Sequence, residues 1–269
     1  MGIYQNRIVV KVGTSTLTYE NGTSDLRTMD HLARVLADVQ NLGYEVILVS
    51  SGAIAVGAAK LGMKQRPTAL KMKQAAAAVG QCSMMFLYDK LFGDYDKTIA
   101  QILLNAEDIE HEEKRENLIN TFDALLGMGV IPVVNENDSV SYTEIESAER
   151  LFGDNDMLSA IVAVLCRARY LIILSDIDGL YDRDPRLSPA ASLIAQIDRI
   201  DEQVFALAGG AGSRRGTGGM KTKLQAAQLA TANGADVVIT NGKRPEAIDA
   251  FLRGEAVGTR FSALDKRAR

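Results

Sequence analysis

Five short, continuous runs of apolar residues constrain the fold of this chain most strongly. Each is rich in Val, Ile or Leu and lacks regular polar alternation, which is typical of parallel strands buried on both faces. Helical patterns separate one run from the next. This alternation predicts right-handed βαβ units and a mainly parallel sheet covered on both faces. The runs are residues 7–12, 45–50, 130–134, 170–174 and 236–240.

The helices between the strands carry start and stop signals. Thr28 is a candidate N-cap for a helix that ends at Gly43. Residues 69–92 form an alanine-rich helix, since alanine has the highest helix propensity. The other elements expected here are a helix over 157–167 capped by 153–156, and an edge strand over 258–261.

Length and composition limit the class of protein. The 269 residues, 47% of them hydrophobic, can form one large domain or two lobes around a sizeable core. The formal net charge of -4 argues against a broad nucleic-acid-binding surface. No run reaches the length of a membrane span and no secretory signal is present, so we expect a cytoplasmic protein without membrane or nucleic-acid partners. Cys82 and Cys166 are expected to be buried thiols, and no Cys/His spacing suits zinc.

Polar residues follow the apolar strands where each strand ends. In open α/β sheets, ligands bind beyond the carboxyl ends of the strands, so we expect these residues to gather at one edge. Loops are polar in any case, which is the alternative. Lys11 favours a ligand site over an ordinary polar loop, because burying a lysine at the end of an apolar strand costs free energy unless an anion pairs with it. The alternative is that its ammonium group extends to solvent at the rim of the sheet. The strand exits are 11–14, 50–52, 135–138, 175–176 and 241–242.

A glycine-rich loop directly before a helix is the second polar feature. Residues 209–219 contain six glycines, and Lys221 and Lys223 fall in the first turn of the helix that follows. Bare backbone N–H groups at a helix N-terminus favour an anionic ligand, most often phosphate, and cations beside them add to this preference. The alternative is a flexible surface loop followed by an ordinary helix.

The inventory of reactive side chains favours phosphoryl transfer. The histidines His31 and His111 are expected to be solvated, and there is no Ser/His/Asp arrangement and no nucleophile elbow. The remaining lysines, carboxylates and amides suit a reaction driven by positioning and charge neutralisation. A carboxylate acceptor, with a pKa of about 4.3, is already ionised at neutral pH and needs no general base. The Walker A loop and the Rossmann glycine pattern are both absent.

Six segments, in order and at plausible spacing, resemble the amino acid kinase family from about Arg7 to Phe261. The resemblance implies a three-layer αβα sandwich with a mainly parallel central sheet. It also implies a single domain over 1–269, with an acceptor-binding lobe to about residue 168 and a nucleotide-binding lobe from about 169. The segments are Val10–Ser15, Ser50–Ala55, Val134–Asp138, Phe152–Asp156, Asp178–Tyr181 with Asp184–Pro185, and Gly216–Lys223.

The resemblance implies transfer of the γ-phosphoryl group of ATP to the γ-carboxylate of L-glutamate, the first step of proline biosynthesis. Lys11 and Lys223 would neutralise the phosphoryl group in flight, and Asp156 would orient these lysines. Mg²⁺ would bridge the phosphates, with no protein ligand assigned to it. The residues implied to hold glutamate are Ser51, Gly52, Ala53, Asn135, Asp138 and Asn155, with Asp138 a partner for the α-ammonium. Those implied to hold ATP are Lys11, Gly13, Thr14, Ser175, Asp176, Thr217, Gly218, Gly219, Met220, Lys221, Thr222 and Lys223.

Partners and regulation come from the same resemblance. A labile acyl phosphate product implies a partner, glutamate-5-semialdehyde dehydrogenase, that consumes it. Feedback inhibition by proline is implied, with the loop Lys64–Met72 as a candidate element. A homo-oligomer is also implied, and Ala75–Phe86 is a candidate interface, with a core helix as the alternative. Many relatives carry an additional C-terminal RNA-binding PUA domain, which we expect to be absent because the chain stops soon after Phe261.

Two alternatives stay open. The first is a kinase of the same fold with another acceptor, such as aspartate, acetylglutamate or a nucleotide. Gly13–Thr14 stands where other family members often have Gly-Gly, which favours glutamate over acetylglutamate or uridylate. The second is an amino-acid sensor that kept the fold without catalysis, and the presence of Lys11, Lys223 and Asp156 argues against it.

Overall fold

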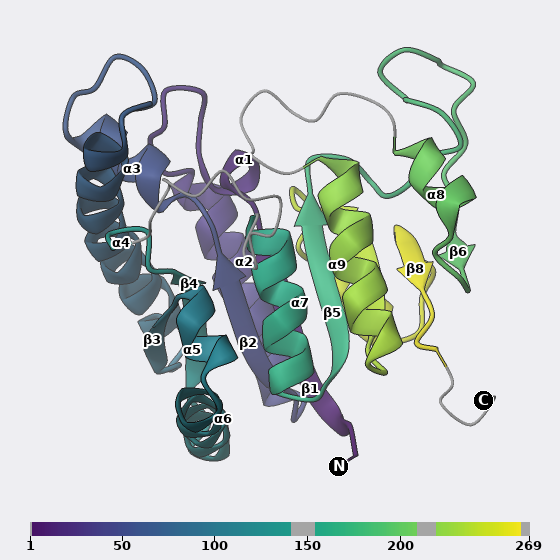
Figure 1. Ribbon diagram of the computed structural model, residues 1–269, viewed down its shortest axis with the longest axis horizontal. Helices are drawn as coiled ribbons and strands as arrows, with labels where there is room; N and C mark the ends of the chain where they lie inside the picture. Colours follow the sequence, from purple (N-terminus) through teal and green to yellow (C-terminus); the bar gives the residue numbers. More distant parts are fainter. Residues whose placement is uncertain (1, 141–153, 209–218, 265–269) are drawn as a thin grey trace.

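The apolar runs form strands of one sheet in this computed structural model (Figure 1). The structure describes residues 2–140, 154–208 and 219–264. The strands are β1 (Tyr4–Val12), β2 (Glu45–Ser50), β3 (Ile99–Leu104), β4 (Ile131–Glu136), β5 (Ala168–Ser175), β6 (Gln196–Ile197), β7 (Asp236–Asn241) and β8 (Thr259–Phe261). The helices are α1 (Thr14–Leu17), α2 (Leu26–Asn41), α3 (Ala53–Lys60), α4 (Leu70–Gly93), α5 (Ala106–Glu110), α6 (Glu112–Gly127), α7 (Asn155–Leu165), α8 (Glu202–Leu207), α9 (Met220–Ala232) and α10 (Ala247–Leu252).

The sheet has eight strands in the order β3-β4-β2-β1-β5-β7-β8-β6. The strand β1 pairs in parallel with β2 on one side and with β5 on the other. Every other pairing between these strands is also parallel, except the antiparallel pairing of β7 with β8. The expected mainly parallel sheet is therefore confirmed. It is continuous across residue 168, where the sequence places the boundary between two lobes.

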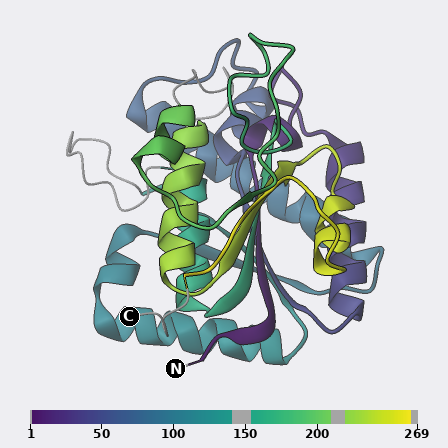
Figure 2. The ribbon, with the colours of Figure 1, turned by 90° about the vertical axis from the view of Figure 1, so that its right-hand side faces the viewer.

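Helices cover both faces of this sheet, as Figure 2 shows with α9 on one side and α2 and α10 on the other. Side chains alternate along β1 between the two faces. Ile8, Val10 and Val12 belong to the core that α2, α3 and α4 complete, whereas Val9 belongs to the core completed by α6, α7 and α9. Lys11 shares the face of Val9 and so points toward α7 and α9. The expected three-layer αβα sandwich is confirmed.

Three local expectations were wrong. The N-cap of α2 is Asp25, not Thr28, because the Asp25 carboxylate accepts the Thr28 N–H at 3.1 Å. The strand β8 is not an edge strand, because β6 pairs with its outer side. Cys82 is exposed because it lies off the buried stripe of α4, whereas Cys166 is buried as expected.

The expected exposure of the two histidines is confirmed, whereas two expected loops lie outside the described residues. His31 on α2 and His111 before α6 are both exposed. The expected flap at 141–151 and most of the glycine-rich loop, 209–218, lie outside the described residues. Within the described part of the chain, no helix combines the length and the apolar character needed to cross a bilayer.

Candidate active site

The polar strand exits meet at one edge of the sheet, because neighbouring parallel strands end level with one another. Val12 of β1 is level with Ser50 of β2 and with Leu174 of β5. Ser175 at the end of β5 is level with Asn241 of β7. These ends lie toward the top of Figure 1. The candidate active site is at this carboxyl edge, as the sequence predicts.

Two lysines and one aspartate form its centre. Lys11 Nζ lies 2.6 Å from Asp156 Oδ1, and Lys223 Nζ lies 3.1 Å from Asp156 Oδ2. The side chain of Asp156 is 1% exposed, and those of Lys11 and Lys223 are 8% and 9% exposed. They come from three different elements, α7, β1 and α9. The structure thus brings together the three residues that the resemblance assigns to catalysis.

The electrostatics of this trio favour a further anion. Burial raises the pKa of Asp156, but the ammonium groups of Lys11 and Lys223 outweigh burial and lower that pKa to about 2. The carboxylate is therefore ionised at neutral pH. Two ammonium groups and one carboxylate sum to a local charge of +1, and an uncompensated buried charge is costly. A phosphoryl group bound beside the two lysines would remove this cost.

Thr222, assigned to the nucleotide by the resemblance, also contacts Asp156. Its Oγ1 lies 2.9 Å from Asp156 Oδ2 and 2.9 Å from the carbonyl oxygen of Gly219. A hydroxyl has one hydrogen, so Thr222 donates to one of these oxygens at a time. Lys221, one residue earlier, is exposed and makes no such contact among the described residues.

The start of α9 suits an anion. Gly219 is its N-cap, and among the described residues no side chain caps this helix. Its first turn holds no acidic residue, whereas Lys221 and Lys223 lie there. The first N–H groups of such a helix have no intrahelical partner and attract phosphate. Thr217 and Gly218, also assigned to ATP, lie outside the described residues.

A second cluster next to the trio holds three residues assigned to glutamate. Asn155 immediately precedes Asp156, and its Nδ2 lies 3.0 Å from Ser50 O, 2.8 Å from Ser51 Oγ and 2.9 Å from Asn135 Oδ1. Two N–H hydrogens cannot serve three acceptors at full strength. Of these acceptors, only Ser51 Oγ can also donate, so it is the group that can turn toward a substrate carboxylate.

Asp154 explains why Asn155 and Asp156 face the site. Asp154 is the N-cap of α7, and its Oδ1 accepts the backbone N–H groups of Asp156 and Met157 at 3.0 and 3.2 Å. The capping function of the Asp-Asn-Asp segment is therefore met by its first residue. Asn155 and Asp156 lie in the first turn of α7, and their side chains do not cap the helix. Asp156 therefore joins the two lysines, and Asn155 joins Ser51 and Asn135.

The turn from β2 into α3 supplies two more residues assigned to glutamate, Gly52 and Ala53. Gly52 has φ of +108°, a conformation that residues with a Cβ rarely adopt, and it is the N-cap of α3. Among the described residues, no side chain caps α3 and its first turn holds no acidic group. Ser51 N–H is used by Val12 O at 3.1 Å, while Ala53 begins the helix and is buried. This helix start also favours an anionic group.

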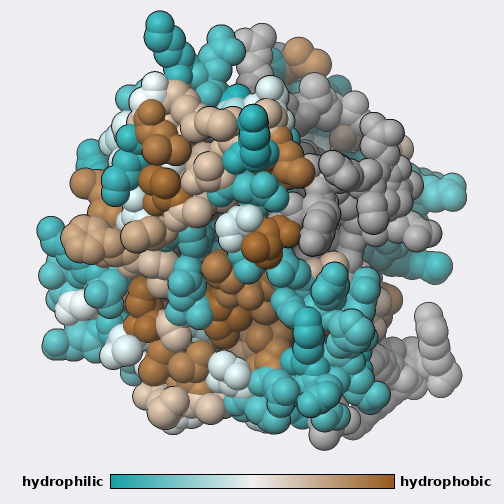
Figure 3. Space-filling model, turned by 60° about the vertical axis from the view of Figure 1, so that its left-hand side comes forward, coloured by the Kyte–Doolittle hydropathy of each residue, from teal (hydrophilic) through white to brown (hydrophobic). Residues whose placement is uncertain are grey.

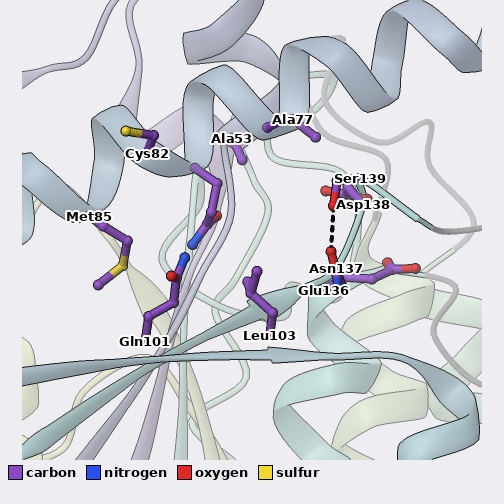
Figure 4. A pocket seen from close by; sticks show the side chains of 12 residues that line it. Ala53, Ala77, Cys82, Met85, Gln101, Leu103, Glu136, Asn137, Asp138 and Ser139 are labelled. Atoms are coloured by element: carbon purple, nitrogen blue, oxygen red, sulfur yellow. Dashed lines mark hydrogen bonds between the residues drawn. The ribbon is translucent and has the colours of Figure 1, made fainter.

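Asp138 lies beyond this cluster, on the wall of a cavity of about 400 Å³ (Figure 4). Burial raises the pKa of Asp138, and the positive charge of Arg66 opposes that effect. Ala53 lines the same cavity, as do Asn137 and Ser139, whose side chains form a hydrogen bond of 2.7 Å. The structure therefore brings Asp138 and Ala53, both assigned to glutamate, to the wall of one cavity.

The end of β5 holds two residues that the resemblance assigns to ATP, Ser175 and Asp176. Ser175 Oγ donates to Asp176 Oδ1 at 3.2 Å, and Asp176 is exposed. Asp178 accepts from Asn241 Nδ2 at 3.0 Å and pairs with Arg244. These contacts lower the pKa of Asp178, the Asn241 hydrogen bond most strongly. They tie the loop after β5 to the loop after β7.

Gly13 and Thr14 follow Lys11 at the end of β1. A Cβ built on Gly13 would lie 3.5 Å from Lys11 Nζ, so this glycine leaves room beside the ammonium group. Thr14 begins α1 and its methyl group approaches Gly52. Gly13 therefore lies beside Lys11 of the trio, and Thr14 lies beside the turn assigned to glutamate.

Two residues of α4 support the site and were missed by sequence reasoning. Gln81 Oε1 accepts from Asn135 Nδ2 at 3.0 Å, and the hydroxyl of Tyr88 lies 2.8 Å from Ser50 Oγ. Burial raises the pKa of Tyr88, so its hydroxyl stays protonated. The available signal was a pair of polar groups seven residues apart, and therefore on one face, in an alanine-rich helix.

Comparisons with known proteins identify the family to which the chain belongs. The model of the amino acid kinase family matches residues 6–241. The chain is 53% identical over 257 residues to a glutamate 5-kinase of Clostridium perfringens (strain 13 / Type A), covering 96% of this chain and 95% of that protein. It is 50% identical over 257 residues to a glutamate 5-kinase of Listeria monocytogenes serotype 4a (strain HCC23), with 96% and 93% covered.

A solved structure of low sequence identity shares the fold. Carbamate kinase from Giardia lamblia bound to AMP-PNP superposes with a TM-score of 0.67 at 15% identity, covering 96% of this chain and 98% of that one. At this identity the likeness concerns the fold alone. With the family model covering most of the chain and relatives half identical along nearly their whole length, the chain belongs to the amino acid kinase family and, within it, to the glutamate 5-kinases.

Proposed function

We propose that this protein transfers the γ-phosphoryl group of ATP to the γ-carboxylate of L-glutamate, which gives L-glutamyl 5-phosphate and begins proline biosynthesis. The observation that carries the proposal is the buried trio of Lys11, Asp156 and Lys223, with its local charge of +1. It lies between the polar cluster around Asn155 and the start of α9, which no side chain of the described residues caps. An acceptor on one side and a nucleotide on the other would meet at the two lysines.

The residues divide the chemistry as follows. The glutamate γ-carboxylate is ionised at neutral pH, so it attacks the γ-phosphorus without a general base. The new carboxylate O–P bond forms as the bond from the γ-phosphorus to the oxygen shared with the β-phosphate breaks, and ADP leaves. Lys11 and Lys223 neutralise the charge that the three phosphoryl oxygens carry, and Asp156 holds both lysines in place. Ser51 and Asn155 orient the acceptor carboxylate. The backbone N–H groups at the start of α9 bind the phosphates of ATP.

Mg²⁺ would accompany the nucleotide and offset phosphate charge. Among the described residues no group of three His, Cys, Asp or Glu side chains is placed to hold a metal ion. The exposed carboxylate of Asp176, at the end of β5, is the protein group that would join the phosphate oxygens as a ligand.

The remaining expectations stay proposals. The acceptor side would be the lobe to about residue 168 and the nucleotide side the lobe from about 169, in a cytoplasmic enzyme. Residues 64–69 are largely exposed, which supports a role for this loop in inhibition by proline. Apolar side chains gather on the side of the molecule shown in Figure 3, which is the side where Figure 1 places α4. Phe86 on α4 is 68% exposed, which supports a homo-oligomer through 75–86. A dehydrogenase acting on the labile acyl phosphate is the expected partner.

A trapping assay tests the proposal. The protein with ATP, Mg²⁺, L-glutamate and hydroxylamine should form a γ-hydroxamate, and no product should form without ATP. Aspartate and acetylglutamate in place of glutamate test other carboxylate acceptors in the same assay. Nucleoside monophosphates are tested by the formation of ADP, because their product gives no hydroxamate. Absence of any ATP-dependent product, together with calorimetric binding of glutamate or proline, would identify a sensor instead.

A further inference from the structure

The oxygen and the nitrogen of the buried Asn135 amide each form a hydrogen bond. Its Oδ1 accepts from Asn155 Nδ2 at 2.9 Å, and its Nδ2 donates to Gln81 Oε1 at 3.0 Å. Asn135 is 3% exposed, so water cannot easily replace either partner. We propose that Gln81 is a positioning residue that fixes the orientation of these two acceptor-binding amides. The inference rests on the proposed glutamate kinase function.

The amides of Asn155, Asn135 and Gln81 form a hydrogen-bonded series, and the backbone oxygen of Ser50 determines which way each amide is oriented. Asn155 Nδ2 faces the backbone oxygen of Ser50, which can only accept, so the Asn155 amide must present its nitrogen there. Asn135 must then present its oxygen to Asn155. Its own nitrogen is left pointing at α4, where Gln81 supplies the acceptor. Without that acceptor a buried donor is unsatisfied, and Asn135 would turn to relieve it and release Asn155.

The backbone of α4 holds Gln81 in place. A Cβ on Gly80, the preceding residue, would overlap the carbonyl oxygen of Ala53. The helix is therefore in backbone contact with the first residue of α3, next to the Ser51-Gly52 turn. A residue on such a rigid element can position its partners closely.

Gln81 also lines the cavity of about 400 Å³ between α4, β3 and the segment after β4 (Figure 4). Gln101 lines the same cavity from β3 and is exposed, whereas the Asn135 amide nitrogen donates to Gln81. The two glutamines therefore share residue type and surroundings but differ in their contact with the acceptor cluster. Because both line the cavity that holds Asp138 and Ala53, the control is a glutamine outside it, the exposed Gln225 of α9.

Steady-state kinetics with each substrate varied in turn test the inference. Gln81→Met keeps the length of the side chain and removes the acceptor; we expect the KM for glutamate to rise about tenfold, while the KM for ATP stays within twofold. Gln81→Glu retains an acceptor oxygen and should keep the KM for glutamate within about threefold of wild type. Gln225→Met, at an exposed glutamine of α9 that does not line this cavity, should leave both KM values unchanged. If Gln81→Met does not fold, as judged by urea unfolding, Gln81→Ala takes its place.

An unchanged KM for glutamate in Gln81→Met would overturn the inference. Equal increases in both KM values, or the same loss in Gln81→Glu, would also overturn it, because either result indicates a merely structural role. Failure of the proposed function is a separate outcome: the wild-type protein itself would then give no glutamate-dependent hydroxamate.

Discussion

At the scale of single residues, Asp156 meets a different lysine with each of its carboxylate oxygens. Lys11 contacts Oδ1 and Lys223 contacts Oδ2, and both lysines are largely buried. The carboxylate thus separates the two cations at a defined distance while leaving one positive charge in excess. That excess is useful only when an anion arrives, which ties the electrostatics of the site to phosphoryl binding.

Replacement of Lys223 tests this role. Lys223→Ala removes one of the two cations, and we expect kcat to fall by about 10²–10³-fold, as for the loss of one donor to a developing oxyanion. The decrease should appear in the hydroxamate assay at saturating ATP and glutamate. Gln225→Ala is the matched control, because Gln225 is exposed on the same helix. A kcat within threefold of wild type for Lys223→Ala would remove this residue from catalysis.

Asp156 also predicts a pH dependence of stability. Its folded-state pKa of about 2 lies below the ordinary 3.8, because the lysines outweigh burial. A lowered carboxyl pKa stabilises the protein above the unfolded-state pKa, and the stabilisation is lost as the pH falls through the folded-state value. The amount is roughly 2 kcal/mol, at 1.36 kcal/mol per pKa unit.

The difference in free energy of unfolding between wild type and Asp156→Asn measures this contribution. We expect the difference to be constant from neutral pH to about pH 4. It should then shrink by roughly 2 kcal/mol toward pH 2, because the amide of the variant cannot titrate. Urea unfolding at a series of pH values gives both curves. A difference that does not change with pH over this range would contradict the pairing.

At the scale of secondary-structure elements, the contact between α3 and α4 positions the acceptor turn. A Cβ on Gly57 would overlap the carbonyl oxygen of Ala76, and a Cβ on Gly80 would overlap that of Ala53. The two helices therefore touch backbone to backbone. This explains why the segment after Gly52 is rich in small residues.

Alanine substitutions test this helix contact. Alanine normally favours a helix over glycine by up to about 1 kcal/mol. At Gly57 or Gly80 we expect the opposite sign, with a loss of about 1–3 kcal/mol from forced separation of the helices. Gly93→Ala at the end of α4 is the control, since nothing lies within 4 Å of its built Cβ. Urea midpoints that rise for Gly80→Ala would show that the helices are not in close contact.

At the scale of the whole molecule, one continuous sheet carries two clusters that we assign to two ligands. Hydrogen exchange can separate them, because loops open locally and bound ligands slow that opening. Glutamate alone should protect the amides of 51–53 and 135–138. A nonhydrolysable ATP analogue with Mg²⁺ should instead protect 175–176 and 220–223. Protection of the same peptides by either ligand alone would contradict the division of the sheet into acceptor and nucleotide sides.

Sequence patterns predicted the centre of the fold better than its margins. The strand over 45–50 has the predicted bounds, and β7 differs by one residue, because continuous burial leaves an unbroken apolar run. The short elements α5, α8 and β6 were missed, since two to six residues carry too little periodicity to detect. The exposure of Cys82 was also missed, because an alanine-rich helix shows little contrast between its faces.

The sequence by itself determined the order of strands and helices, the burial of the central strands and the polar character of their exits. These properties are local, since they depend on which residues are apolar and at what spacing. Only the tertiary structure decided which buried residues meet. Lys223 reaches Asp156 across 67 positions of the chain, and Gln81 reaches Asn135 across 54. Hydrophobic periodicity specifies that a residue faces the interior, whereas strand order and helix packing select its neighbour there.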